Sequence, residues 1–273
     1  MAVGLLEEYD LDVGRRRSVD LIRTSVSGAV MTIVLDDVPR RNALSRQMVT
    51  ELLAAIDQGE RNPLVRVVVV TNEGTVFCAG ADLTESSHEQ LNDSTGRTSE
   101  LSEVFSRIMA SPKPFVGRLN GHCVAGGVGL AAVMDISIAV SHAKFGFTEV
   151  RVGVAPAIIS VVCLPKMRQA DASAAFLRGT QFLADEAVRM GLINLAVTPQ
   201  ELDDEVTKVV SDLLAGEPTA IAVAKKLTRD VPKLSVSEAL AWTSALSAEL
   251  FTSEAAREGM AAYLEKRPAP WVQ

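Results

Sequence analysis

The chain has 273 residues, of which 48% are hydrophobic and 22% charged, so it can bury the core of one large domain. Its net charge of −7 argues against a general nucleic-acid binder and against a protein of anionic membrane surfaces. Three cysteines and three histidines without metal-ligand spacing predict free thiols, a reducing compartment and no metal site. Acids interrupt the first 17 residues, and Asp135 interrupts the longest apolar stretch. We therefore expect neither a signal peptide nor a membrane helix, and a cytoplasmic protein.

Strands and helices are expected to alternate over the first two thirds of the chain. The hairpin signal Ser27-Gly28 separates two alternating segments, and Ser45 is a suitable helix cap. A basic turn over 39–42 links this hairpin to the helix, and the Ser/Thr-rich range 84–99 indicates a surface loop or lid. The expected strands cover residues 19–26, 29–35, 66–71, 114–119 and 136–140. The expected helices cover residues 45–58, 101–109 and 157–162.

Helical patterns alone follow residue 197. Pro199 and Pro218 stand at first-turn positions, and Ser235 and Ser253 are plausible caps. The expected helices cover residues 199–215, 218–229, 235–250 and 253–267. The sequence thus predicts a layered α/β core followed by a helical region for assembly. The expected organisation is a flexible lead over 1–17, a core over 18–198 and a helical region over 199–273.

The stretch from Asn120 to Glu149 carries two features with chemical meaning. Gly126-Gly127 stands where a helix begins, so unpaired backbone N–H groups are accessible there and favour negative oxygen. Glu149 lies among Phe145 and Phe147, a setting that raises a carboxyl pKa by desolvation and suits it to proton transfer. Taken one at a time, the glycine pair is more often a tight turn, and a glutamate in an apolar phrase more often faces water.

A dinucleotide site is the competing interpretation of the same stretch. The segment from Gly127 to Ala132 fits the pattern G-x-G-x-x-A, and Glu149 follows roughly 20 residues later, where a ribose-binding acid belongs. That fingerprint should follow its strand at once, whereas residues 120–126 intervene here. Glu149 also does not close a strand, so the match is weak.

A second glycine turn matches the first in form. FCAGAD (77–82) and NGHCVAGG (120–127) each present backbone N–H groups after a strand. Two such donors that converge on one carbonyl oxygen would form an oxyanion hole. Glu149 would then be the group that transfers protons.

Together these motifs resemble the crotonase superfamily of enoyl-CoA hydratases and isomerases, over nearly the whole chain. The combination of AGAD and the glycine pair is the most specific part of this resemblance. It implies a crotonase-like spiral of ββα units, with a C-terminal helical region that forms a trimer or a dimer of trimers. The matching phrases are NAL (42–44), VVVVTNEGTVFCAGADL (67–83), NGHCVAGGVGLAAVMDISIA (120–139), FGFTEVRVGVAP (145–156) and EGMAAYLEKR (258–267).

The resemblance also implies site residues. The oxyanion-hole amides would be those of Ala81 and Gly126, and Glu149 would be the catalytic carboxylate. No cofactor is implied, since coenzyme A is part of the substrate. Lys266 would reach the nucleotide phosphates of a neighbouring subunit, although a solvated lysine at a helix end is an equally good interpretation. The implied CoA contacts are Arg41, Ala43, Ala79, Asp82, Leu83 and Lys266.

One position departs from the hydratase pattern. Hydratases of this family usually carry two glutamates, and Gly129 stands where the first would be. Three explanations remain: Glu149 does both tasks, an acid such as Glu85 or Glu89 of the polar loop contributes, or the protein is an isomerase.

The phrases GVGL and FGFTEVRVGVAPAIIS are most similar to methylglutaconyl-CoA hydratases, which favours hydration. Ala157 stands where dienoyl-CoA isomerases carry an extra aspartate, which disfavours that branch. A catalytically weak acyl-CoA-binding protein is the remaining alternative. The acyl chain, the pathway and the choice between trimer and hexamer are not specified by the sequence.

Overall fold

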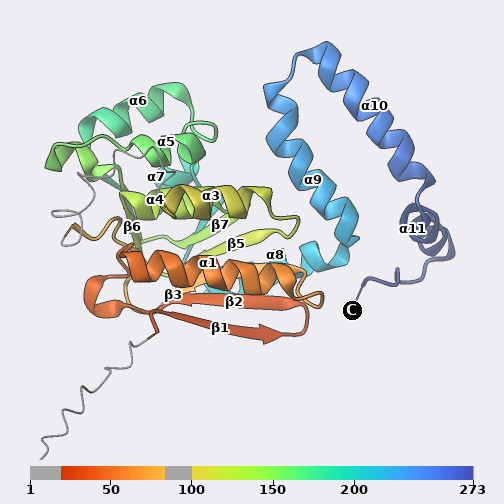
Figure 1. The fold of residues 1–273 in the computed structure, drawn as a ribbon, viewed down its shortest axis with the longest axis horizontal. Coiled ribbons are helices and arrows are strands. Elements are labelled where there is room, and N and C mark those ends of the chain that lie inside the picture. The colour runs from red at the N-terminus through yellow and green to blue at the C-terminus, as the bar shows by residue number, and fades with distance from the viewer. Residues whose placement is uncertain (1–19, 84–99, 273) are drawn as a thin grey trace, which may run out of the picture.

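A computed structural model describes residues 20–83 and 100–272, which form a mixed α/β core followed by a helical region (Figure 1). The larger sheet has the strand order β1-β2-β3-β5-β7-β10, and the smaller sheet has the order β4-β6-β8-β9. The strands of the larger sheet are β1 (Ile22–Ser27), β2 (Val30–Leu35), β3 (Val67–Asn72), β5 (Phe115–Leu119), β7 (Ile136–Val140) and β10 (Leu195–Val197). Those of the smaller sheet are β4 (Val76–Cys78), β6 (His122–Val124), β8 (Lys144–Gly146) and β9 (Gln181–Leu183).

The predicted hairpin and buried strand are confirmed. β1 and β2 pair antiparallel, and Gly28 joins them with a φ of 55°, which a residue without a side chain adopts readily. β2, β3, β5, β7 and β10 pair parallel in that order. All six residues of β3 are buried, because helices cover a parallel sheet on its faces and leave no side of a central strand for solvent.

The helices predicted for the core are present as well. Ser45 caps α1 by accepting a hydrogen bond from the backbone N–H of Met48. Next to the strands, α1 packs on α3, and α3 packs on α4 (Figure 1). The core helices are α1 (Arg46–Arg61), α3 (Glu100–Ala110), α4 (Gly126–Val133), α5 (Ala157–Cys163), α6 (Gln169–Arg178) and α7 (Ala184–Arg189), with the 3-10 helices η1 (Val38–Arg40) and η3 (Thr148–Val152).

The helical region divides into two parts. The helix α8 (Leu202–Ala215) packs on β3, β5 and β7. It buries Leu202, Val206 and Val210, so it lies on the core. The helices α9 (Pro218–Asp230), α10 (Val236–Thr252) and α11 (Glu254–Glu265), with the short η4 (Val231–Lys233), extend away from the core (Figure 1). We call residues 218–272 the arm. The predicted boundary at residue 198 stays a prediction, although the projecting part begins at α9.

The far end of the arm returns to the core. Arg66, just before β3, donates one guanidinium hydrogen bond to the backbone oxygen of Trp271 (2.6 Å) and another to that of Gly216 (2.5 Å). The indole N–H of Trp271 donates to the backbone oxygen of Ala215 at 3.1 Å. The arm is therefore a loop of helices that is attached to the core near both of its ends.

Candidate active site

The two glycine turns lie against each other in the structure. A side chain at Gly80 would put its Cβ 2.9 Å from the Cβ of Ala125 and 3.1 Å from the amide nitrogen of Gly126. An ideal Cβ at Gly126 would in turn lie 3.7 Å from the amide nitrogen of Ala81. The structure thus brings together the two amides that the sequence assigned to an oxyanion hole. Gly126 is the first residue of α4, where a backbone N–H has no acceptor within the helix.

Close backbone packing explains the small residues of these turns. A Cβ at Gly127 would lie 2.1 Å from the backbone oxygen of Cys78, so no side chain fits there. Ala125, which precedes α4, has a φ of 49°, a conformation that side-chain-bearing residues rarely adopt. Such backbone strain costs on the order of 1–3 kcal/mol and clusters at functional sites. The turn is held by a hydrogen bond from the Ala125 amide to the backbone oxygen of Gly146, at 2.9 Å.

The buried Asn42 side chain organises the neighbouring turn. Its Oδ1 accepts from the Asp37 amide at 2.7 Å, and its Nδ2 donates to the backbone oxygens of Glu73 and Val76. Arg41 and Asn42 both have positive φ values, 56° and 53°, which turn the chain sharply after η1.

This turn runs beside the AGAD segment, where the resemblance expects CoA contacts. The Ala79 amide donates to the backbone oxygen of Arg41 (3.1 Å), and the Leu44 amide donates to that of Gly80 (2.8 Å). Two of the segments expected to contact CoA, Arg41 to Ala43 and Ala79, are therefore adjacent.

The other expected CoA residues are more dispersed. Asp82 is buried, whereas Leu83 is 63% exposed, and both directly follow the Ala81 amide. Lys266 is the C-cap residue of α11 on the arm. Figure 1 shows α11 far from α4 of the same chain. Its predicted role across a subunit interface stays a prediction. Glu85 and Glu89, the acids considered as partners of Glu149, lie outside the described residues.

Glu149 lies in the first turn of η3 and is half-buried. Its Oε2 is buried and has no hydrogen-bond partner within the described ranges. Burial raises the pKa of this carboxyl above its ordinary value of 4.5, because a desolvated carboxylate is penalised relative to the neutral acid. A carboxyl with a raised pKa and a free oxygen is suited both to accepting a proton and to returning it.

Asp135, the nearest competing acid, has a structural role. Its Oδ2 accepts a hydrogen bond from the Phe115 amide at 2.7 Å and forms an ion pair with Lys225. This agrees with its interpretation as a turn residue between helix and strand.

The position of the missing glutamate is closed by apolar side chains. An ideal Cβ at Gly129 would lie 2.4 Å from Cγ2 of Ile159 and 2.9 Å from Cζ of Phe105. Both of these side chains are 3% exposed. Gly129 is thus not an open space beside the site but a contact between α4, α5 and α3.

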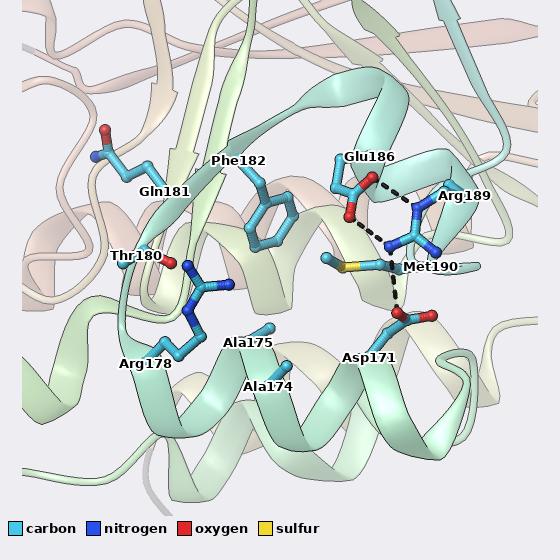
Figure 2. Close-up of a pocket in the computed structure, with 10 residues that line it drawn as sticks. All are labelled: Asp171, Ala174, Ala175, Arg178, Thr180, Gln181, Phe182, Glu186, Arg189 and Met190. Carbon is cyan, nitrogen blue, oxygen red and sulfur yellow. Dashed lines mark hydrogen bonds and ion pairs between the residues drawn. The ribbon is translucent and has the colours of Figure 1, made fainter.

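A separate hollow of about 230 Å³ lies between α6, β9 and α7 (Figure 2). Its charged side chains are largely paired with one another, since Arg189 forms ion pairs with both Glu186 and Asp171 (Figure 2). It contains no residue that the sequence assigned to the site. The lining residues are Asp171, Ala174, Ala175, Arg178, Thr180, Gln181, Phe182, Glu186, Arg189 and Met190.

Two further features concern the chain as a whole. Cys78, Cys123 and Cys163 are free and buried, as predicted, and burial raises the pKa of each thiol, that of Cys78 to about 12. Among the helices in the described ranges, none is long and apolar enough to cross a membrane.

Known proteins are similar to this chain in both sequence and fold. The family model described as enoyl-CoA hydratase/isomerase matches residues 25–273. A short-chain-enoyl-CoA hydratase of Clostridium acetobutylicum is 30% identical over 244 residues, which cover 88% of this chain and 93% of that protein. A carnitinyl-CoA dehydratase of Salmonella arizonae is 30% identical over 259 residues, covering 92% of this chain and 97% of that protein.

A crystal structure of an enoyl-CoA hydratase of Mycobacterium smegmatis superposes with a TM-score of 0.88 at 29% identity. The match covers 93% of this chain and 99% of that one. The crotonase-like α/β fold with a C-terminal helical region, predicted from the motifs, is confirmed. The chain belongs to the enoyl-CoA hydratase/isomerase family, that is, to the crotonase superfamily.

Proposed function

We propose that the protein is an enoyl-CoA hydratase that adds water to the double bond of a 2-enoyl-CoA thioester. The observation that carries the proposal is the pair of adjacent turns at Gly80-Ala81 and Gly126, together with the carboxyl of Glu149, whose pKa is raised by burial. The names of relatives at about 30% identity support hydration as the reaction type.

The proposed reaction runs through an enolate. The thioester oxygen accepts hydrogen bonds from the amides of Ala81 and Gly126, which stabilise the negative charge as it develops. The Glu149 carboxylate takes a proton from water while the water oxygen attacks C3. The same carboxyl then gives this proton to C2, which yields the 3-hydroxyacyl-CoA and restores the carboxylate.

The CoA part of the substrate is proposed to bind along the two neighbouring segments. Arg41 and Ala43 lie on one segment, and Ala79, Asp82 and Leu83 lie on the other. The backbone hydrogen bonds that join the two segments support a shared binding role. Lys266 would contribute from a second copy of the chain. We propose no cofactor beyond the CoA of the substrate, and the cytoplasmic location stays a prediction from the sequence.

A homo-oligomer, trimer or dimer of trimers, is part of the proposal. Apolar side chains of the arm are exposed to solvent in the single chain, including Leu240 (62% exposed) and Phe251 (67% exposed). No residue of α9 or α10 is buried in the single chain. Apolar surface of this extent is normally covered by another protein surface.

Isomerisation is the second candidate, and the closed position at Gly129 favours it. One carboxylate is enough to remove a proton from C2 of a 3-enoyl-CoA and return it to C4, which moves the double bond without water. A catalytically weak acyl-CoA-binding protein is the third candidate, suggested by the same glycine.

A panel of enoyl-CoA thioesters separates the three candidates. Straight, branched and carboxylated 2-enoyl and 3-enoyl thioesters are incubated with the protein, and the products are separated by chromatography and identified by mass. A gain of one water on a 2-enoyl substrate supports the hydratase, and conversion of a 3-enoyl substrate at unchanged mass supports the isomerase. Tight binding without turnover of any thioester contradicts both enzymatic proposals.

A further inference from the structure

The hollow between α6, β9 and α7 lies apart from the two glycine turns and has an apolar middle (Figure 2). It exists because α6 presents the small side chains of Ala174 and Ala175 to β9 and α7. The ring of Phe182 and the side chain of Met190 lie across from these alanines (Figure 2). Four apolar side chains thus surround a space that none of them fills.

Contacts outside the hollow hold its walls in place. The amide of Arg168, directly before α6, donates to the backbone oxygen of Met190 at 3.1 Å. At the other end of α6, the Arg151 guanidinium donates to the backbone oxygen of Arg178 at 2.8 Å. Both ends of the helix are therefore fixed to neighbouring segments. A space whose walls are fixed before a ligand arrives is typical of small-molecule sites.

The charged side chains around the hollow leave one positive charge without a partner. Arg189 forms ion pairs with both Asp171 and Glu186, and Arg168 forms another with Asp171. Two carboxylates thus have two guanidinium partners. The Arg178 side chain lies on the opposite side of the hollow (Figure 2) and forms no hydrogen bond or ion pair with any residue that the structure describes. This unpaired cation stands out in a protein with a net charge of −7.

The apolar middle and the unpaired guanidinium together define a class of ligand. A guanidinium binds a carboxylate through two parallel hydrogen bonds, which also fix its orientation. The apolar side chains suit a hydrocarbon body, since a polar body would lose its water there without new hydrogen bonds. The volume of about 230 Å³ lies below the roughly 300–1,000 Å³ of pockets for drug-sized ligands, so the ligand must be small.

We propose that this hollow binds the anion of a small carboxylic acid, with Arg178 on the carboxylate and the hydrocarbon body against Phe182 and Met190. The inference does not rest on the proposed function, because the hollow shares no residue with the candidate active site. It does border that site. Arg151, which holds the end of α6, follows Glu149 by two residues in η3.

Hexanoate is a suitable probe, because it joins a carboxylate to a short apolar chain. Calorimetric titration of the wild-type protein should show one saturable site with a Kd of about 1 mM or tighter. Hexanamide has the same chain without the charge, and acetate has the charge without the chain. Each should bind at least about tenfold more weakly, because each keeps only one of the two interactions.

Two pairs of variants locate the bound hexanoate. Arg178→Gln removes the proposed partner of the carboxylate and should raise the Kd at least about fivefold. Arg61→Gln removes an arginine whose side chain is 82% exposed on α1, and should leave the Kd unchanged. Ala174→Leu fills the hollow and should raise the Kd at least about fivefold. Ser173→Leu adds the same side chain to α6 outside the lining and should leave the Kd unchanged.

Hexanoate that binds Arg178→Gln and Ala174→Leu as tightly as it binds wild type is bound elsewhere, which overturns the inference. A wild-type protein without saturable binding up to about 10 mM also overturns it, as does hexanamide that binds as tightly as hexanoate. The comparison with hexanamide needs no variant, so it decides the question even where a substitution prevents folding. Binding is measured without turnover, so an inactive protein would contradict the proposed function and leave this inference standing.

Discussion

The ammonium group of Lys225, on the arm helix α9, lies 2.8 Å from the carboxylate of Asp135, directly before β7. The same Nζ donates to the backbone oxygens of Ile108 (2.8 Å) and Lys113 (3.0 Å), and it lies 5.3 Å from the centroid of the Phe115 ring. Its side chain is 9% exposed. This one residue thus fixes the near end of the arm to the segment between the site helix α4 and the central sheet.

Replacing Lys225 by methionine is expected to destabilise the protein by about 3 kcal/mol, because the Asp135 charge and two carbonyl oxygens lose their partner in a largely buried place. Urea unfolding measures this difference. Lys226→Met is the control, since Lys226 is an exposed neighbour whose ammonium group lies over the Trp242 ring. This substitution should change the free energy of unfolding by less than about 1 kcal/mol. If both substitutions lowered the free energy of unfolding equally, the contact between Lys225 and Asp135 would add no more stability than an exposed lysine does.

Glu149→Gln is expected to lower turnover by at least about 10²-fold, in the range of 10²–10⁴ typical of a general acid–base group. The amide keeps the shape of the side chain but cannot carry the proton, so acyl-CoA binding should change little. Steady-state kinetics and a calorimetric titration with acyl-CoA check the two parts. A variant that turns over its best enoyl-CoA within a few-fold of wild type would remove Glu149 from the mechanism and direct attention to Glu85, Glu89 and Asp82.

The raised pKa of Glu149 also predicts a pH-dependent stability difference. Because burial favours the protonated form, the folded state gives up stability as the pH rises from the ordinary value of 4.5 through the raised pKa. Glu149→Gln carries no such penalty, so it should be more stable than wild type at pH 7. The advantage should vanish below about pH 4.5, where both side chains are neutral. A pH-independent difference in thermal midpoint would contradict a buried, ionised Glu149.

Gly126→Pro should reduce turnover to a small residual rate, since proline removes the N–H assigned to the oxyanion hole. The helix itself tolerates proline at its first position, where the N–H has no helical partner. Loss of one such donor costs roughly 3 kcal/mol, or about 10²–10³ in kcat. Gly126→Ala is the control that keeps the N–H while adding a Cβ, which would lie 3.1 Å from the flexible Leu44 side chain. A folded proline variant with near-normal rates would show that Gly126 is not a donor.

The arm is expected to be covered in solution by other copies of the chain. Sedimentation velocity at micromolar concentration should show a trimer or a dimer of trimers. Replacing the exposed apolar residues Leu240 and Phe251 by aspartate should shift the protein toward smaller species, because a charged side chain is costly inside an apolar interface. A wild-type protein that sediments as a monomer would contradict this prediction.

The sequence predicted the elements whose signals are local. The Ser45 cap, the β-branched run that became β3 and the glycine pair at the start of α4 each depend on residues that are neighbours in the chain. The same holds for the two turns of the candidate oxyanion hole, because each motif forms its own turn.

The shortest strands, and the contacts between segments that are distant in the sequence, were not predicted. The strands β6, β8, β9 and β10 have three residues each, which is too few for an alternating pattern to show. The helices α6 and α7 were also missed. The apolar contacts that close the position of Gly129 depend on where α5 crosses α4, and the motifs specify neither helix's position. The Lys225 contact likewise joins segments that are distant in sequence.

The hydrogen bonds of Arg66 have a consequence for the order in which the chain is completed. Residues 22–215, which build the sheets and α8, leave the ribosome before Trp271 does, so the core can form while the arm is held only at the Lys225 end. In such a nascent chain the Arg66 guanidinium can bind the Gly216 oxygen but still lacks its second acceptor. The loop of helices closes when Trp271 arrives, and opening the far end of the arm then breaks the part-buried hydrogen bond between Arg66 and Trp271.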